Sequence, residues 1–207
     1  MRLLSKTVLI AAVLAGVPML AQAESTFTTG AGTPLTASAR VDFQITIPKI
    51  LFLQVGTGTA YAANAAINQI AFTVPAASVG NGTAVAATPA SGDLLNGVVT
   101  AKVLGNNGDV TLSSTTLGAL GNGSGDTISY SQITTTPAVL SSAAALPAPA
   151  LADAATTTLP ALTAVNKIVN RDARWTYSYL NGGVVAPGTY GGVNTNNSRV
   201  TYTASMP

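Results

Sequence analysis

The chemistry open to this chain is limited first by the residue types that it lacks. The sequence contains no His and no Cys, which removes the usual proton shuttle, the thiol nucleophile and the ligands of most zinc and copper sites. Its single Glu is Glu24, so a pair of catalytic glutamates of the glycosidase kind cannot form, although aspartate pairs remain available. No motif of a serine hydrolase, a nucleotide-binding loop or a zinc protease occurs. We therefore expect no enzymatic activity and no cofactor.

Two aspartates end clusters rich in Gly and Asn, and they are the best candidates for metal ligands. Asp109 follows Gly105-Asn-Asn-Gly, and Asp126 follows a similar run that begins at Gly121. Oxygen-rich loops of this kind can bind Ca²⁺, but neither run has the residue order of a calcium-binding loop or repeat. We interpret both as tight turns and expect no metal site.

The densest charge cluster of the chain precedes a row of aromatic residues. The cluster is Arg171, Asp172 and Arg174, and the row is Trp175, Tyr177 and Tyr179. Side chains at alternate positions of a strand share one face. On the surface, the rings with Arg171 and Arg174 would form a platform for sugars or for a protein partner. We favour the alternative that the row faces a core, because strands generally bury their aromatic residues.

Residues 1–23 have the pattern of a secretory signal peptide. Basic residues precede an apolar run from Thr7 to Leu20, and Ala21-Gln22-Ala23 is a small-x-small cleavage site. Removal of this peptide takes away two of the nine basic residues and leaves seven residues of each sign. We therefore expect an exported, nearly neutral protein that binds no nucleic acid. No later apolar run is long enough to span a membrane.

The clearest structural signal is a strict alternation from Leu35 to Ile47. Every odd-numbered residue in this run is apolar and every even-numbered one is polar, which is typical of a strand with one buried face. The pattern predicts that Val41, Phe43, Ile45 and Ile47 face the core. At about 3.4 Å per residue the run would extend about 44 Å, so it is long enough for two pairing units. Its first half, with the flexible leader 24–36, could pair with another subunit.

Short alternating runs separated by turn residues predict strands along the rest of the chain. The expected strands are 50–55, 67–74, 98–104, 110–114, 127–133, 174–180 and 199–206. The runs 98–104 and 110–114 flank a Gly/Asn-rich turn and are expected to form a hairpin. An Ala/Pro-rich insertion at about 138–164 is expected to lie outside the sheets, either as an ordered loop or with a short helical turn around 143–146. The fold class is therefore all-β, a single antiparallel sandwich over residues 37–207.

Two stretches near the ends of the chain resemble a known family. They are Ala39-Arg-Val-Asp-Phe-Gln-Ile-Thr-Ile-Pro48, and Val185-Ala-Pro-Gly-Thr-Tyr190 followed by Arg199-Val-Thr-Tyr-Thr-Ala204. They are similar to the first and last strands of cysteine-free fimbrial subunits of the chaperone-usher type, which Gram-negative bacteria secrete. The resemblance implies an incomplete immunoglobulin-like sandwich that the N-terminal segment of another copy completes. It also implies a periplasmic chaperone and an outer-membrane usher as partners.

These observations lead to two functional hypotheses. The first is a structural subunit of an extracellular fibre, in which copies of the protein join through Phe27, Leu35, Ala37 and Ala39 of the donor segment. The alternative is a monomeric cell-surface adhesin or carbohydrate-binding module that presents its aromatic row in an exposed groove. The two differ in whether the aromatic row is exposed and in whether copies of the chain associate.

The signal peptide leads to a direct prediction. We expect the exported protein to begin at Glu24, because Ala21 and Ala23 occupy the two positions that signal peptidase reads. Intact-mass measurement of the exported protein checks this. A mass that includes residues 1–23 would contradict both the cleavage and the extracellular location.

Overall fold

The computed structural model describes residues 25–32, 34–59 and 61–207, so the expected signal peptide and its cleavage site lie outside the described residues. The chain divides into two compact units, a first one that ends at Ile47 and a second one, Pro48–Pro207. The second unit therefore begins 11 residues later than the sandwich boundary expected at residue 37. Each unit is described by itself below.

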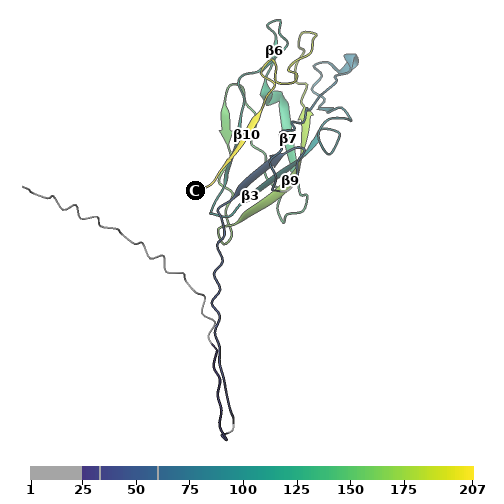
Figure 1. Cartoon of the computed structure of the whole chain (residues 1–207). Coiled ribbons are helices and arrows are strands. Elements are labelled where there is room, and N and C mark those ends of the chain that lie inside the picture. The colour runs from purple at the N-terminus through teal and green to yellow at the C-terminus, as the bar shows by residue number, and fades with distance from the viewer. Residues whose placement is uncertain (1–24, 33, 60) are drawn as a thin grey trace, which may run out of the picture. The chain divides into compact units, whose positions relative to one another are not determined.

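The second unit is an antiparallel β-sandwich, which confirms the expected fold class (Figure 1). Its larger sheet contains β1 (Leu51–Val55), β3 (Val98–Gly105), β9 (Val169–Tyr179), β2 (Val85–Ala86) and β7 (Ile133–Ala138). Its smaller sheet contains β10 (Thr201–Ser205), β4 (Thr111–Thr115) and β8 (Thr156–Thr158). The short strands β5 (Leu120–Gly121) and β6 (Thr127–Ile128) form a separate pair. Two single-turn 3₁₀ helices, Ala76–Ser78 and Tyr130–Gln132, complete the regular structure.

The core lies between the two sheets and follows the alternation of the sequence. Along β3 the buried and half-buried residues alternate without interruption, and the inward row of β9 includes Ala173, Trp175 and Tyr177. Val110 and Leu112 of the second sheet complete this cluster from the opposite side. Period-two burial of this kind is what a strand produces when one of its faces is covered.

The expected hairpin from Val98 to Ser114 is wrong, although both of its strands exist. β3 pairs with β1 and β9, whereas β4 pairs with β10 and β8. The turn at residues 106–110 therefore carries the chain from one sheet to the other instead of joining neighbours. Sequence signals a turn by its Gly and Asn residues, but they do not determine which sheet the next strand joins. The strand expected at 67–74 is also reduced, to a single bridge between Phe72 and Ala87.

The Ala/Pro-rich stretch was expected outside the sheets, and this expectation is wrong. Leu146 is fully buried and accepts a hydrogen bond from the indole nitrogen Nε1 of Trp175 at 2.8 Å. Residues 156–158 of the same stretch form β8. The expected helical turn at 143–146 is absent from the described chain, which runs there without regular structure. Three prolines prevent a helix, but the extended chain that they favour still packs its apolar residues against the sandwich.

A buried carboxylate fastens this stretch to β9. Asp172 accepts hydrogen bonds from the backbone nitrogens of Ser141 and Ser142, both at 2.8 Å, and from the Ser141 hydroxyl. Burial raises the pKa of Asp172, but the hydrogen bonds from Ser141 and Ser142 outweigh it and lower the pKa to about 2. Hydrogen bonds to the charged form stabilise that form. The residue that sequence analysis placed in a surface charge cluster is thus a structural anchor.

The order of the strands is that of an immunoglobulin-like sandwich without its last strand. Neighbouring strands β1, β3, β9 and β7 correspond to the A, B, E and D strands of that architecture, and β4 and β10 correspond to C and F. In a complete domain a seventh strand, G, follows F and pairs with it. The described chain ends its regular structure at β10 and contains no counterpart of strand G.

The N-terminal arm, defined here as residues 25–47, differs from expectation. Its described residues contain no β-strand, and the exposed fractions of Val41, Phe43, Ile45 and Ile47 are 71, 90, 83 and 76%. The prediction that these four side chains face the core of their own chain is therefore wrong. A period-two pattern indicates that one face can be buried, but it does not say which chain supplies the covering surface.

Burial of the Ala/Pro-rich stretch leads to a prediction about stability. Substitution Leu146→Ala should destabilise the sandwich by about 2 to 5 kcal/mol, because it leaves a cavity beside Trp175. The matched control is Leu117→Ala: Leu117 is 77% exposed, and its loss should change stability by no more than about 0.5 kcal/mol. Chemical denaturation of both variants measures the difference. Equal losses would contradict the assignment of this stretch to the core.

Candidate functional site

The most distinctive feature of the second unit is a pair of neighbouring sheet edges. Within the described chain, β1 pairs with β3 alone and β10 pairs with β4 alone, so each strand has one edge without a ladder. The two strands belong to different sheets but contact each other along one side of the sandwich. An unpaired edge presents backbone N–H and C=O groups in a row and can pair with an added strand.

Two apolar rows line this side of the core and are incompletely covered. On β1 the row consists of Leu51, Leu53 and Val55, and on β10 and just after it the row consists of Tyr202, Ala204 and Met206. Leu53, Val55 and the β10 row pack against the central cluster yet stay half-exposed. The two rows approach each other at Gly105, where an added Cβ atom would lie 2.8 Å from Met206 Sδ and 3.5 Å from Leu51 Cδ1. The core thus lacks a cover between these edges.

The aromatic row belongs to this core and forms no surface. Trp175, Tyr177 and Tyr179 are buried. Their burial confirms the interpretation that the row faces inward, and the alternative of an exposed platform for a ligand is wrong. The Trp175 ring lies 5.3 Å from the ring of Tyr202 at an interplanar angle of 53°. The hydroxyl oxygens of Tyr177 and Tyr202 lie 2.9 Å apart and share a hydrogen bond. These contacts hold β10 against the larger sheet at the edge where cover is missing.

The two arginines of the platform hypothesis are not brought together with the rings. Arg174 is exposed, and its even-numbered position places it on the opposite face of β9 from Trp175. Arg171 is half-exposed and lies opposite Val103 in the β3 ladder. The five residues therefore share a strand but do not share a ligand surface.

The calcium candidates behave as turn residues. The Asp109 Oδ1 oxygen accepts a hydrogen bond from the backbone nitrogen of Ala164 at 2.8 Å, and Asp126 Oδ2 accepts one from Asn122 Nδ2 at 2.8 Å. Among the residues that the structure describes, no three side chains of His, Cys, Asp or Glu lie close enough together to hold a metal ion. The described part of the chain likewise contains no helix long and apolar enough to cross a membrane.

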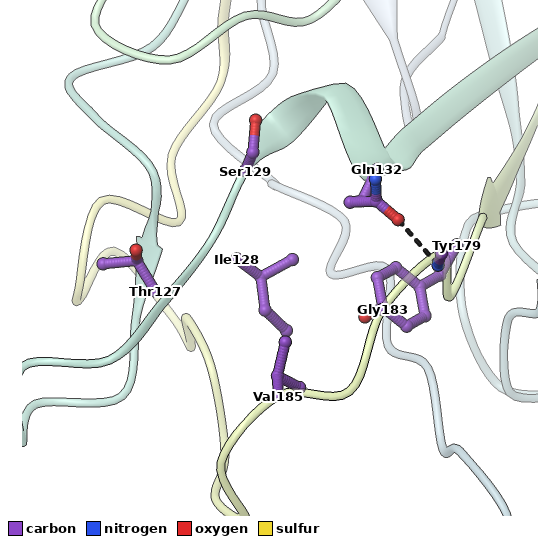
Figure 2. Close-up of a pocket in the computed structure, with 8 residues that line it drawn as sticks. Thr127, Ile128, Ser129, Gln132, Tyr179, Gly183 and Val185 are labelled. Carbon is purple, nitrogen blue, oxygen red and sulfur yellow. Dashed lines mark hydrogen bonds between the residues drawn. The ribbon is translucent and has the colours of Figure 1, made fainter. Parts of the chain in front are cut away.

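A shallow hollow of about 240 Å³ lies at one end of the sandwich (Figure 2). Ile128 and Val185 point toward each other across it, and Gln132 Oε1 accepts a hydrogen bond from the Gly182 nitrogen at 2.9 Å. Its lining is otherwise made of Thr127, Ser129, Tyr179 and Gly183. This lining includes no carboxylate and no amine, and Tyr179 is its one phenol.

The N-terminal arm is the other exposed apolar element. Its candidate donor residues Phe27, Leu35, Ala37 and Ala39 are all exposed. Within the arm, Thr26 Oγ1 donates to the Ser38 carbonyl oxygen at 2.8 Å and Thr28 Oγ1 donates to the Thr36 carbonyl oxygen at 3.2 Å. Two antiparallel extended legs therefore meet around residues 29–35, and the longer leg continues to Ile47 with its apolar row uncovered.

Sequence reasoning missed the residues that define the edges. Tyr202 was considered only as part of the stretch Arg199–Ala204, although it contacts both Trp175 and Tyr177. The alternation of residues 199–206 was the available signal, since it places Tyr202, Ala204 and Met206 on one face. The lack of a strand beside β10 could not be read from that pattern.

Comparison of the chain with models of protein families, with curated proteins and with solved structures gave no match.

The buried tyrosine pair predicts a loss of stability in alkali. Burial raises the pKa of Tyr177 to about 12, although its hydrogen bond with Tyr202 opposes part of this rise. Burial also raises the pKa of Tyr202 well above 10, and the neighbouring Tyr177 raises it further. The unfolded chain releases these protons at lower pH than the folded chain. The contribution of the two protonated tyrosines to folding stability is therefore complete below about pH 10 and is lost as the pH rises toward about 12.

Urea denaturation across this pH range measures the loss. Tyr177→Phe keeps the ring but removes one titrating group, so the variant should be less stable by about 1 kcal/mol at neutral pH and should lose less stability in alkali. A wild-type unfolding midpoint that stays constant up to about pH 12 would contradict the burial of this pair.

Proposed function

We propose that the protein is a structural subunit of an extracellular fibre, and that copies join when the N-terminal arm of one copy adds a strand between β1 and β10 of the next. The observation that carries the proposal is that one chain contains both an uncovered apolar arm and a pair of unpaired sheet edges. An exposed extended arm with a strict apolar row is present, and so are two adjacent sheet edges above an incompletely covered core. Strand addition satisfies both at once.

The faces of the arm match the faces of the site. An arm that lies between β1 and β10 would turn Val41, Phe43, Ile45 and Ile47 toward the half-covered apolar rows. Its polar row would then join the outer face of β10, which carries Thr201, Thr203 and Ser205. The added strand would occupy the position of the seventh strand of a complete immunoglobulin-like sandwich.

The energies are large enough to hold subunits together. Full burial of a large apolar side chain contributes about 1.5 to 3 kcal/mol, so the four side chains Val41, Phe43, Ile45 and Ile47 together contribute roughly 6 to 12 kcal/mol. Backbone hydrogen bonds to β1 and β10 add to this, and the ordering of the arm opposes it. Each subunit has one arm and one site, so the association is head-to-tail and produces an open chain.

The proposed donor segment is longer than the leader expected from sequence. Phe27, Leu35, Ala37 and Ala39 stay candidates for the contact, and the exposure of Val41 to Ile47 extends the donor toward the sandwich. The exported location, a periplasmic chaperone and an outer-membrane usher follow from the resemblance to fimbrial subunits. A chaperone would have a physical task here, because an uncovered apolar edge promotes premature association.

The alternative of a monomeric adhesin or carbohydrate-binding module has lost its main support. It depended on an exposed aromatic row, and Trp175, Tyr177 and Tyr179 are buried. The described hollows contain no comparable stack of rings. A structural role without catalysis therefore has the better support.

Charge substitutions in the arm test the proposal with a matched control. Phe43→Asp should abolish fibres, because a carboxylate would have to be buried without a partner. Gln44→Asp introduces the same charge on the neighbouring residue but on the polar face, and it should leave assembly intact. Electron microscopy of the sheared cell-surface fraction reads the result. Fibres in both variants, or in neither, would contradict insertion of the arm in this register.

A deletion separates the two parts of the arm. Removal of residues 24–36 takes away Phe27 and Leu35 and leaves the stretch from Val41 to Ile47. If the leader is the essential donor, this variant should form no fibres while its sandwich stays folded and β-rich by circular dichroism. Normal fibres would restrict the donor to the second part of the arm.

A further inference from the structure

One side chain clamps the chain at the point where the arm joins the sandwich. Asn106 Nδ2 donates to the Pro48 carbonyl oxygen at 2.8 Å, and Asn106 Oδ1 accepts from the Ile50 nitrogen at 2.8 Å. The Asn106 backbone nitrogen also donates to the Ile50 carbonyl oxygen at 3.4 Å. A single residue thus binds both ends of the segment Pro48–Ile50.

The clamp keeps this segment extended. The β1–β3 ladder ends at the pair Leu51 and Gly105, so Ile50 and Asn106 would be its next pair. The backbone after Asn106 turns toward the second sheet, and the Asn106 side chain supplies the acceptor and the donor that the ladder would otherwise lose. The Asn106 side chain therefore holds Pro48 and Ile50 where a continued antiparallel ladder would place them, although residues 48–50 lie outside the strand.

A second contact ties the same segment to the end of β10. Lys49 Nζ donates to the Pro207 carbonyl oxygen, and Asn107 Nδ2 donates to the same oxygen at 2.7 Å. The Lys49 bond connects the segment before β1 with the residues after β10, and the Asn107 bond ties the turn after β3 to the same oxygen. They lie at the end of the edges from which a chain reversing at residues 48–50 would enter.

The arm is joined to the strand that forms one edge of the proposed site, because β1 begins four residues after the arm ends at Ile47. Because the arm directly precedes β1, it could pair with the edge of its own β1 by reversing over Pro48–Ile50, as in a hairpin with a three-residue loop. Because only residues 48–50 separate the arm from β1, the effective concentration of the arm at its own site is high. An arm inserted there would occupy the site that the arm of another copy needs. Growth of a fibre therefore requires that the reversal be prevented.

We infer that Asn106 is a positioning residue that favours strand addition between copies over insertion of a chain's own arm, by holding Pro48–Ile50 in the extended conformation that a hairpin loop cannot adopt. This inference rests on the proposed function. It assigns to Asn106 the choice between a fibre and a closed monomer. The hydrogen bonds to Pro48 and Ile50 each oppose the reversal of the chain.

Asn106→Ala should raise the ratio of closed monomer to fibre about tenfold, the equivalent of ~1.4 kcal/mol. Asn106→Asp keeps the acceptor for the Ile50 nitrogen but loses the donor to Pro48, so its ratio should lie between those of the wild type and the alanine variant. The matched control is Asn170→Ala, which removes an exposed asparagine side chain of β9 without touching Pro48, Ile50 or Pro207 and should behave as the wild type. Size-exclusion chromatography measures the ratio for the full exported chain.

Disulfide trapping shows where the arm lies, which a mere change in stability would not alter. The chain has no Cys, so the pair Gln44→Cys and Thr203→Cys, and a second pair with Thr201→Cys, report only on the introduced sites. These residues would share the outer face of the completed sheet, where directly opposed side chains have Cβ atoms about 4.5 to 5.5 Å apart. Oxidation followed by non-reducing electrophoresis separates links between chains from links within a chain.

Links between chains in the wild type and within a chain in Asn106→Ala would support the inference. Links between chains in both backgrounds would overturn the role of Asn106 and leave the proposed function standing. Links within a chain in both would show that the clamp does not prevent self-insertion, which also overturns the inference. No link in either background would mean that the arm does not reach β10, and the proposed function would fail with it.

Discussion

The packing of Trp175 is the contact on which the rest of the sandwich depends. Its ring is fully buried on β9, its indole nitrogen donates to Leu146 in the Ala/Pro-rich stretch, and its face lies against Tyr202 of β10. One side chain thereby joins the larger sheet, the smaller sheet and a long connection with little regular structure. A buried tryptophan combines a large apolar area with one donor that needs a partner. The carbonyl of Leu146 is available only if that connection crosses the core at this place.

The sequence predicted the strands better than their partners. Alternation in the runs 98–104, 110–114 and 199–206 placed β3, β4 and β10 within one or two residues, because a period of two depends only on local burial. It did not predict that β3 and β4 enter different sheets, since the Gly/Asn-rich turn is compatible with either geometry. The Ala/Pro-rich stretch was expected outside the sheets because its prolines and low complexity give no period-two pattern, yet its residues 156–158 form β8. Leu146, Leu151 and Leu162 are buried all the same.

Of the two parts of the candidate site, the donor arm was predictable from the sequence and the receiving edges were not. The alternation from Leu35 to Ile47 identified a segment with a complete apolar face, and in the structure this segment is an exposed arm without a β-strand. The assignment of Val41 to Ile47 to the core of the same chain failed because an apolar row carries no information about the molecule that covers it. The receiving edges could not be predicted at all. They are defined by the absence of a neighbour beside β1 and β10, which is a property of the topology and not of either sequence segment.

The topology also has a consequence for the speed of folding. The ladders of both sheets join distant parts of the chain: Ser205 bonds to Thr111, 94 residues away, and Tyr202 of the same strand packs on Trp175 of β9. Chains dominated by such non-local pairs pay loop-closure entropy before they gain contacts, and they fold in milliseconds to seconds, far more slowly than helical bundles. A chain of this kind stays unfolded while its last strand is still being synthesised. For the exported subunit proposed above, that delay would keep the chain threadable through a secretion channel, and the sandwich would close in the compartment where the whole chain is present.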